Sequence, residues 1–282
     1  GLEAARVAAE RGHKVILFEA AAKPGGQILL TAALKRRREI LGIVDWRVAE
    51  CERLGVEFRL NTWAEAADVL AETPDCVVIA TGGLPNLDLL SEGQDLAVTS
   101  WDILSNSVAP AKSVIVVDNN GGHSGMTIAE YVAERADEME LVTPDRILAP
   151  EIGSTAYPGY VRALNRTGAK VTLNLRIDRL ERRGNKIAAI FTDEFAGQER
   201  VKEADQVVVE YGTTPLDDLY FALKDGSRNR GEVEVKAMIH GRAQTLATNP
   251  AGRYQLFRIG DAVASRNIHA AILDAYRLMV AV

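Results

Sequence analysis

The start of the chain constrains the fold most, because a helix, a glycine stop, a buried strand and a carboxylate follow one another there. Residues 2–11 contain strong helix formers with an apolar stripe, and Gly12 is a typical helix end. Residues 14–18 (KVILF) are typical of a buried strand, which ends on Glu19. In a dinucleotide-binding unit, G-x-G-x-x-G precedes the first helix, and an acidic residue ends the second strand about 20 residues later. The pattern fits if Gly1 is the last glycine of that fingerprint.

This interpretation places the first strand and the first two glycines of the fingerprint outside the sequence. Such a first strand has neighbours on both sides, so its loss would leave open hydrogen-bonding edges. We therefore expect the chain to be part of a longer protein.

Strands and helices continue to alternate along the rest of the chain. Buried strands followed by glycine-containing turns are predicted at 76–80, 113–118, 206–210 and 254–259. A helix is predicted at 267–280, and Gly184-Asn185 indicates a hairpin. The pattern predicts an α/β fold with two Rossmann-like dinucleotide-binding domains, each a three-layer structure around a parallel sheet. The second domain (109–240) would be nested in the first (1–108 and 241–282).

A second, degenerate glycine loop occupies residues 119–125 (NNGGHSG). If Gly125 is its third glycine, Gly122 is the second, but Asn120 stands at the first position. The acid expected at the end of the next strand is also absent, because Leu141-Val142 runs into Thr143-Pro144. Both differences weaken the case for NAD at this loop, and a structural turn explains it as well as a nucleotide pocket does.

The remaining composition excludes several classes of protein and site. A net charge of −6, from 33 basic and 39 acidic residues, argues against nucleic-acid binding. No apolar stretch approaches the roughly 18 residues of a membrane-spanning helix, and no signal peptide is visible. Two cysteines, Cys51 and Cys76, exclude a disulfide framework and cannot alone hold an iron–sulfur cluster. We expect a cytoplasmic protein without a metal site or a catalytic Ser-His-Asp arrangement.

Several short motifs together resemble one family of flavoproteins. Flavoproteins with two dinucleotide-binding domains share, in this order, Glu19, KPGGQ at 23–27, ATGG at 80–83 and IGDA at 259–262. The C-terminal region of the trimethylamine dehydrogenase and 2,4-dienoyl-CoA reductase family is similar at VTSWD (98–102), DNNGGH (118–123) and SRNIHAA (265–271). Residues 35–46 (KRRREILGIVDW) most resemble the N-methylproline and dimethylglycine demethylases of that family. The resemblance covers essentially the whole chain.

The resemblance implies a larger flavin-dependent oxidoreductase, of which this chain is the cofactor-binding, electron-transfer part. Family members carry FMN and an iron–sulfur cluster in an N-terminal (β/α)8 barrel, where the substrate reacts; that barrel is not in this chain. The chain itself would hold FAD, or ADP as in the trimethylamine dehydrogenase type, and whether its nested domain binds NAD(P) stays open. Its partners would be its own barrel domain, an electron-transfer protein and further copies in a homo-oligomer.

The same resemblance implies an N-methyl amine or amino-acid demethylase as the parent enzyme. Two alternatives stay open: an NAD(P)H-dependent enoyl reductase of the same superfamily, and a non-catalytic ADP-binding module. Asn120 and the missing strand-end acid favour the amine-oxidising type.

The expected cofactor contacts follow from the motifs. Glu19 would accept hydrogen bonds from the adenosine ribose, and such charge-assisted bonds are strong. Asp261 would accept a bond from a ribityl hydroxyl, although Asp also favours turns and helix caps. No catalytic residue or metal ligand is predicted. The expected cofactor-binding residues are Gly1, Glu19, Ala20, Gly25, Gly26, Gln27, Ala80, Thr81, Gly82, Gly260, Asp261, Asn267 and Ile268.

Overall fold

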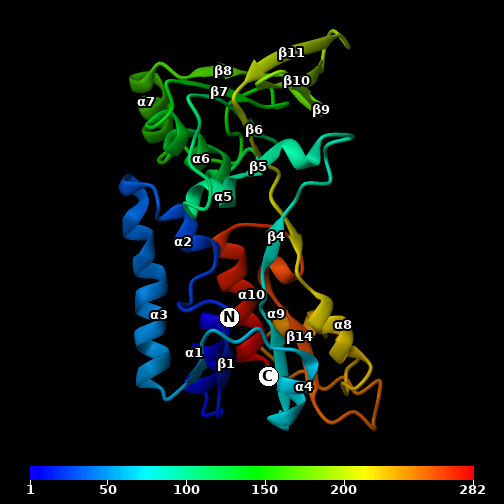
Figure 1. Cartoon of the computed structure of the whole chain (residues 1–282). Coiled ribbons are helices and arrows are strands. Elements are labelled where there is room, and N and C mark those ends of the chain that lie inside the picture. The colour runs from blue at the N-terminus through cyan, green and yellow to red at the C-terminus, as the bar shows by residue number, and fades with distance from the viewer. The chain divides into compact units, whose positions relative to one another are not determined.

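The computed structural model describes residues 1–282, which divide into two compact units (Figure 1). Unit 1 comprises Gly1–Ile28, Ile40–Leu84 and Thr213–Val282, and unit 2 comprises Leu29–Glu39 and Pro85–Gly212. The boundaries thus fall near residues 84 and 212, whereas the sequence analysis placed domain boundaries at 108 and 240. The first boundary lies earlier than predicted because the strand at Ala97–Thr99 pairs with the strand at Gln206–Glu210 and so belongs to unit 2.

Unit 1 contains two separate parallel ladders. One joins β1 (Ile16–Phe18) to β2 (Glu57–Arg59), and the other joins β3 (Cys76–Ile79) to β14 (Gln255–Arg258). β1 pairs only with β2, and β14 only with β3, so each of these two strands has an edge without a partner. A short ladder of β4 (Gly83–Pro85) and β13 (Thr213–Pro215) follows the ends of the longer strands.

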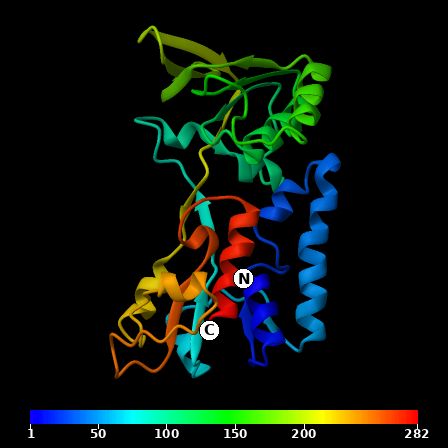
Figure 2. The ribbon, with the colours of Figure 1, turned by 180° about the vertical axis from the view of Figure 1, so that it is seen from behind.

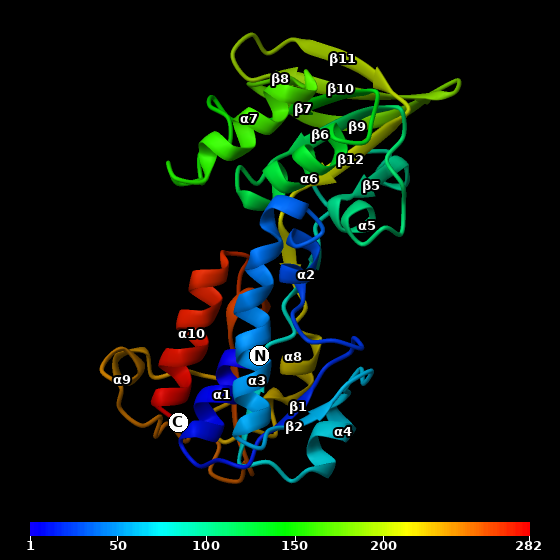
Figure 3. The same ribbon diagram turned by 90° about the vertical axis from the view of Figure 1, so that its left-hand side faces the viewer.

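Helices cover the strands of unit 1. α1 (Leu2–Glu10) packs against α3 (Gly42–Arg53) and α10 (Ile268–Val280), as Figure 3 shows. Their buried faces meet the strands in a core that includes Val7, Phe257 and Leu278. The shorter helices of this unit are α2 (Gln27–Thr31), which runs on into unit 2, α4 (Ala66–Ala71), α8 (Asp218–Lys224) and α9 (Val235–Ile239).

Unit 2 is built on a five-stranded parallel sheet with the strand order β5-β12-β6-β7-β8. These strands are β5 (Ala97–Thr99), β12 (Gln206–Glu210), β6 (Ser113–Asp118), β7 (Glu138–Val142) and β8 (Lys170–Thr172). An antiparallel sheet adds β9 (Leu175–Arg183), β10 (Lys186–Asp193) and β11 (Glu199–Ala204). The β9–β10 pairing confirms the hairpin predicted at Gly184-Asn185.

The parallel sheet of unit 2 is covered on both faces, which explains its continuous apolar strands. Val114 and Val116 of β6 pack with α5 (Ser100–Leu104), α6 (His123–Ala133) and α7 (Tyr157–Thr167). Ile115 and Val117 face the antiparallel sheet instead. Figure 2 shows the same layers from behind. The short helical turn η1 (Lys35–Leu41) begins in this unit, and η2 (Gln94–Leu96) lies within it.

The buried strands predicted from the sequence correspond to β3, β6, β12 and β14, and the predicted first and last helices to α1 and α10. No helix is both long enough and apolar enough to cross a bilayer.

Candidate nucleotide-binding site

Two glycine-containing turns of unit 1 lie side by side because the strands before them pair in parallel. Ile79 of β3 is opposite Arg258 of β14, and the Ile259 N–H donates to the Ile79 carbonyl at 3.0 Å. Ala80 and Gly260 therefore leave the ladder at the same edge. A Cβ placed on Gly1 would lie 3.7 Å from the Ala80 Cβ, so the start of α1 reaches the same place. In parallel α/β sheets, ligands bind at this edge.

A long-range hydrogen bond joins two of the predicted site residues. The Gln27 side-chain amide, on the first residue of α2, donates to Asp261 Oδ2 at 2.9 Å, although the two residues are 234 positions apart. The other oxygen of Asp261, Oδ1, accepts the Arg266 N–H at 3.3 Å. The PGGQ segment and the IGDA turn are thus held together at the strand ends.

Glu19 follows β1 and closes a turn with its carboxylate. Its Oε1 accepts the Ala21 N–H at 2.9 Å, and the side chain is half-buried while Ala20 beside it is exposed. The Thr62 N–H after β2 donates to the Glu19 carbonyl, so this position is fixed by the neighbouring strand. Glu19 Oε2 accepts no hydrogen bond from the protein and is available to a ribose hydroxyl. No direct contact links Glu19 to Gln27 or Asp261.

The glycines at this edge adopt backbone conformations that favour glycine. Gly26 and Gly82 have φ of 52° and 75°, and a Cβ on either would meet nothing within 4 Å. Gly25 and Gly260 also have positive φ, 137° and 61°. Open space beside left-handed glycines allows a ligand to approach the backbone closely. These residues therefore fit a nucleotide bound along the strand ends.

The remaining predicted residues have structural roles that are visible in this structure. Thr81 donates its hydroxyl to the Leu216 carbonyl. Asn267 caps α10, because its Oδ1 accepts the Ala270 N–H at 3.0 Å, and Ile268 is the first residue of that helix. Asp261 lies in the preceding turn (Gly260–Ala262), so the alternative role of an α10 cap belongs to Asn267. The assignment of all thirteen residues to a cofactor stays a prediction.

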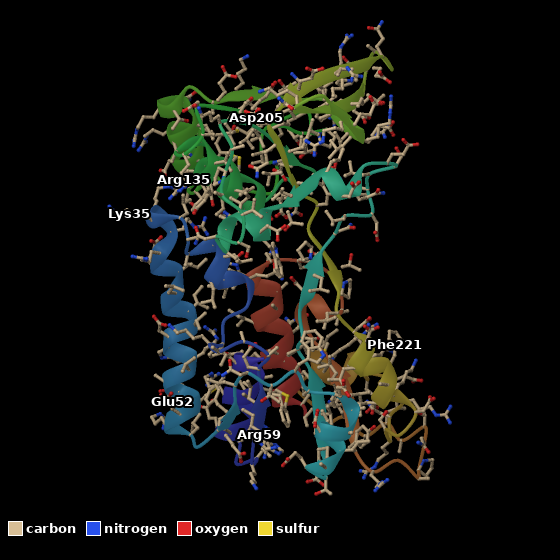
Figure 4. All side chains as sticks on the ribbon, in the orientation of Figure 1. Lys35, Glu52, Arg59, Arg135, Asp205 and Phe221 are labelled. Carbon is tan, nitrogen blue, oxygen red and sulfur yellow. The ribbon has the colours of Figure 1, made fainter.

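The sequence analysis missed an ion pair beside this edge. Arg258, the last residue of β14, bonds the Asp217 carboxylate, and its guanidinium lies 4.6 Å from the Tyr220 ring centre and 5.6 Å from that of Phe221. Phe221 is exposed on α8 (Figure 4). A basic residue ending an otherwise apolar strand was the available sequence signal. The pair ties the start of α8 to the IGDA turn.

The second glycine loop, in unit 2, connects β6 to α6 and lies beside two buried carboxylates at the ends of strands. Asp118 and Glu210 end β6 and β12 at directly opposed positions of the sheet. The pKa of Asp118 is raised to about 7, mainly by burial and also by Glu210 and Asp145, although two backbone N–H bonds act to lower it. Burial likewise raises the pKa of Glu210.

His123, the first residue of α6, belongs to a cluster of unit 2 that includes Arg37 and Tyr160. Arg37 Nη1 lies 2.6 Å from the Tyr160 hydroxyl and 3.0 Å from His123 Nδ1. Burial, together with Arg37 and Arg36, lowers the pKa of His123. The cluster fixes the segment at Arg37 against α6 and α7.

Proteins of known family are similar to this chain over nearly its whole length. The family model for pyridine nucleotide-disulphide oxidoreductases matches residues 1–275. A "Probable N-methylproline demethylase" of Rhizobium meliloti (strain 1021) is 49% identical over 279 residues, which are 99% of this chain and 41% of the relative. The N,N-dimethylglycine/sarcosine dehydrogenase of Chromohalobacter salexigens is 43% identical over 289 residues, 99% of this chain and 42% of the relative. The chain thus spans about two fifths of these relatives, and the resemblance inferred from the motifs is confirmed.

Solved structures give the same fold. A 2-naphthoyl-CoA reductase complex matches with a TM-score of 0.80 and 26% identity, over 100% of this chain and 38% of that one. Histamine dehydrogenase from Rhizobium sp. 4-9 has a TM-score of 0.81 at 21% identity, over 99% and 42% of the two chains. Thioredoxin reductase from T. acidophilum, with a TM-score of 0.65 and 16% identity, matches over 100% of this chain and 93% of its own.

Proposed function

This chain belongs to the pyridine nucleotide-disulphide oxidoreductase family, and from that premise we propose that unit 1 binds FAD, or ADP, as the electron-transfer part of a larger flavin-dependent oxidoreductase. The observation that carries the proposal is the meeting of Gln27 with Asp261 beside the open glycines Gly26 and Gly82. These groups come from three distant parts of the chain and converge where the parallel strands end.

The residues of this site have separate tasks in the proposal. Glu19 Oε2, which has no protein donor, would accept from the adenosine ribose, and a charged acceptor makes this bond stronger than a neutral one would. On cofactor binding, the hydrogen bond between Gln27 and Asp261 would weaken, and each side chain would form hydrogen bonds to the cofactor. Gly26 and Gly82 would let the backbone lie against it. A bound flavin would supply the redox chemistry, and the protein its position and electrostatic surroundings.

The relatives suggest the parent reaction. Both demethylase-type relatives named above match nearly all of this chain, which supports an N-methyl amine or amino-acid demethylase as the complete enzyme. Its substrate would react in a barrel domain with FMN and an iron–sulfur cluster, outside this chain. We further propose a cytoplasmic homo-oligomer that exchanges electrons with a carrier protein.

A second candidate function has support of its own. A "Multifunctional alkene reductase/demethylase OYE" of Caballeronia cordobensis is 40% identical over 283 residues, 100% of this chain and 42% of the relative. Its name joins a reductase activity to a demethylase activity. An enoyl reductase of the same superfamily is therefore the runner-up.

Titration of the purified chain with FAD and with ADP tests the proposed site. We expect saturable binding that Glu19→Ala weakens by about 10-fold to 100-fold, because a hydrogen bond to a charged group contributes about 1.5–3 kcal/mol. Glu52→Ala is the matched control, since Glu52 is exposed on α3 away from the strand ends (Figure 4).

Unchanged affinity in the Glu19 variant would show that the adenosine is held elsewhere. Flavin absorption in the purified chain would support FAD, whereas ADP retained in a colourless chain would favour the nucleotide-binding module.

A further inference from the structure

The family is named for a pyridine nucleotide, and unit 2 has the fold in which such a dinucleotide is expected to bind. In that fold, the glycine loop before the first helix binds the pyrophosphate through backbone N–H groups and a helix N-terminus. The corresponding loop here runs from Asn119 to Gly125, between β6 and α6. The hydrogen bonds of this loop show whether its backbone N–H groups are free to bind a pyrophosphate.

The side chain of Asp118 already uses two of the backbone donors of this loop. Its Oδ1 accepts the Asn120 N–H at 2.9 Å and the Gly121 N–H at 3.0 Å. A Cβ on Gly125 would overlap the Asp118 carboxylate, so this group lies between the end of β6 and the first turn of α6. The third glycine therefore makes room for a side chain of the protein itself. The carboxyl group thus lies on the inner side of the loop and binds two of its N–H donors.

The first position of the loop is also occupied. The Asn120 side-chain amide donates to Ser124 Oγ at 2.8 Å and lies 3.4 Å from Glu210 Oε1. Glu210 in turn accepts from the Ser100 hydroxyl and from the Gly212 N–H. A glycine at this position would permit close approach of a ligand, whereas the exposed Asn120 side chain lies over the loop and is held by these hydrogen bonds.

The segment after β7 closes the outer side of the loop. The Glu151 N–H donates to the Gly121 carbonyl at 3.0 Å. A Cβ on Gly121 would lie 2.9 Å from Asp145 Oδ2 and 3.0 Å from the Pro150 ring. Thr143, 1% exposed, stands where a ribose-binding acid is expected. The segment after β7 therefore leaves no space beside Gly121.

Charge acts in the same direction as this steric block. Asp118, Asp145 and Glu210 surround the loop, and the largest charge effects on Asp118 come from the other two. A pyrophosphate would add negative charge beside buried carboxylates, which is costly where water is excluded.

We propose that unit 2 excludes pyridine dinucleotides, and that Asp118, Asn120 and Glu210 are the residues that exclude them. The family's nucleotide-binding loop is kept here as an internally bonded structural turn. NAD(P)H bound at this loop would then not be the electron carrier. The chain would exchange electrons with a different carrier.

Calorimetric titration of the 282-residue chain with NADH and NADPH tests this proposal. It is performed at pH 8, where Asp118 is mainly ionised, and in the Glu19→Ala variant, so that binding in unit 1 is weakened and the exchange data locate any binding that remains. We expect no saturable binding. A Kd of about 100 µM or tighter, with hydrogen-exchange protection of residues 119–125 by NADH, would overturn the proposal.

A gain-of-function variant tests the named residues. Asp118→Ala with Asn120→Gly frees two backbone N–H groups and restores the glycine, so we expect saturable NADH binding to appear, with a Kd of about 100 µM or tighter. The matched control is Asp193→Ala with Asn185→Gly, because Asp193 also accepts two backbone N–H groups, from Phe195 and Ala196, but lies away from the loop. An equal affinity in the two double variants would show that Asp118 and Asn120 are not the block. If the first variant does not fold, the titration of the Glu19→Ala chain and its exchange data still decide the proposal.

Discussion

Asp118 is a buried carboxylic acid whose pKa lies near neutral pH, far above its ordinary value. It is 1% exposed, and Glu210 and Asp145 are the charged groups with the largest effects on it. Two N–H donors partly stabilise its ionised form, but burial still raises its pKa from 3.8 to about 7. Such a group stabilises the folded state while it holds its proton.

The sign of the pH dependence follows from this shift. Between pH 3.8 and about 7 the folded state binds a proton at Asp118 that the unfolded state has already lost. Stability from this group is therefore fully present below the lower pKa and is lost as the pH rises through the upper one.

Asp118→Asn is the reference variant, because Asn does not titrate. We expect the free energy of unfolding of the wild-type chain, minus that of Asp118→Asn, to decrease between pH 4 and pH 7. Urea unfolding at several pH values in that interval measures the difference. A difference that stays constant over this interval would mean that Asp118 is ionised in the folded state throughout.

At the scale of the element, the short helix η1 is attached to α6 by one well-formed ion pair. Arg36 Nε and Nη2 contact the two carboxylate oxygens of Glu130 at 3.0 and 2.5 Å. Glu130 is only 3% exposed, and the guanidinium also lies 4.5 Å from the Tyr160 ring centre. The bidentate geometry is the stronger form of this interaction.

Removal of Arg36 would leave the Glu130 charge buried without its partner. We expect Arg36→Leu to lower the free energy of unfolding by about 2 kcal/mol, below the usual 3–5 kcal/mol for a buried pair because Arg36 is partly exposed. Arg36→Leu with Glu130→Leu should recover part of the loss, since no charge is left unpaired. Denaturant unfolding of both variants checks this; equal losses would show that the attachment depends on packing alone.

Elements whose pattern is local were predicted well. β6 and β12 are continuous apolar runs, and α10 follows an Asn that caps it. The glycine loop at 119–125 was recognised as degenerate from its spacing, but the sequence left a structural turn and a nucleotide pocket equally open. The side-chain network that fixes it was not visible, because Glu210 lies 90 positions from Asn120.

At the scale of the whole molecule, the chain passes between two units, and the proposed cofactor site belongs to unit 1 alone. Gly1, Gln27, Ala80 and Asp261 come from three sequence segments of that unit. A ligand at these residues should stabilise the strands and helices that carry them, and the core of unit 2 should respond little.

We expect hydrogen exchange with saturating ADP to show added protection at residues 16–28, 79–83 and 259–270, with little change at 114–133. Exchange measured by mass spectrometry with and without ADP provides the comparison. Equal protection in both units would contradict a site confined to unit 1.

The sequence by itself determined the order of strands and helices, the glycine turns after the buried strands, and the family, because these depend on local periodicity and short motifs. Only the tertiary structure decided which side chains meet. Gln27 reaches Asp261 across 234 positions, and the loop at Asn120 is closed by Asp118, Glu210 and Pro150. Parallel pairing fixes such meetings through strand order and register, which residues distant in sequence establish only when the whole chain packs.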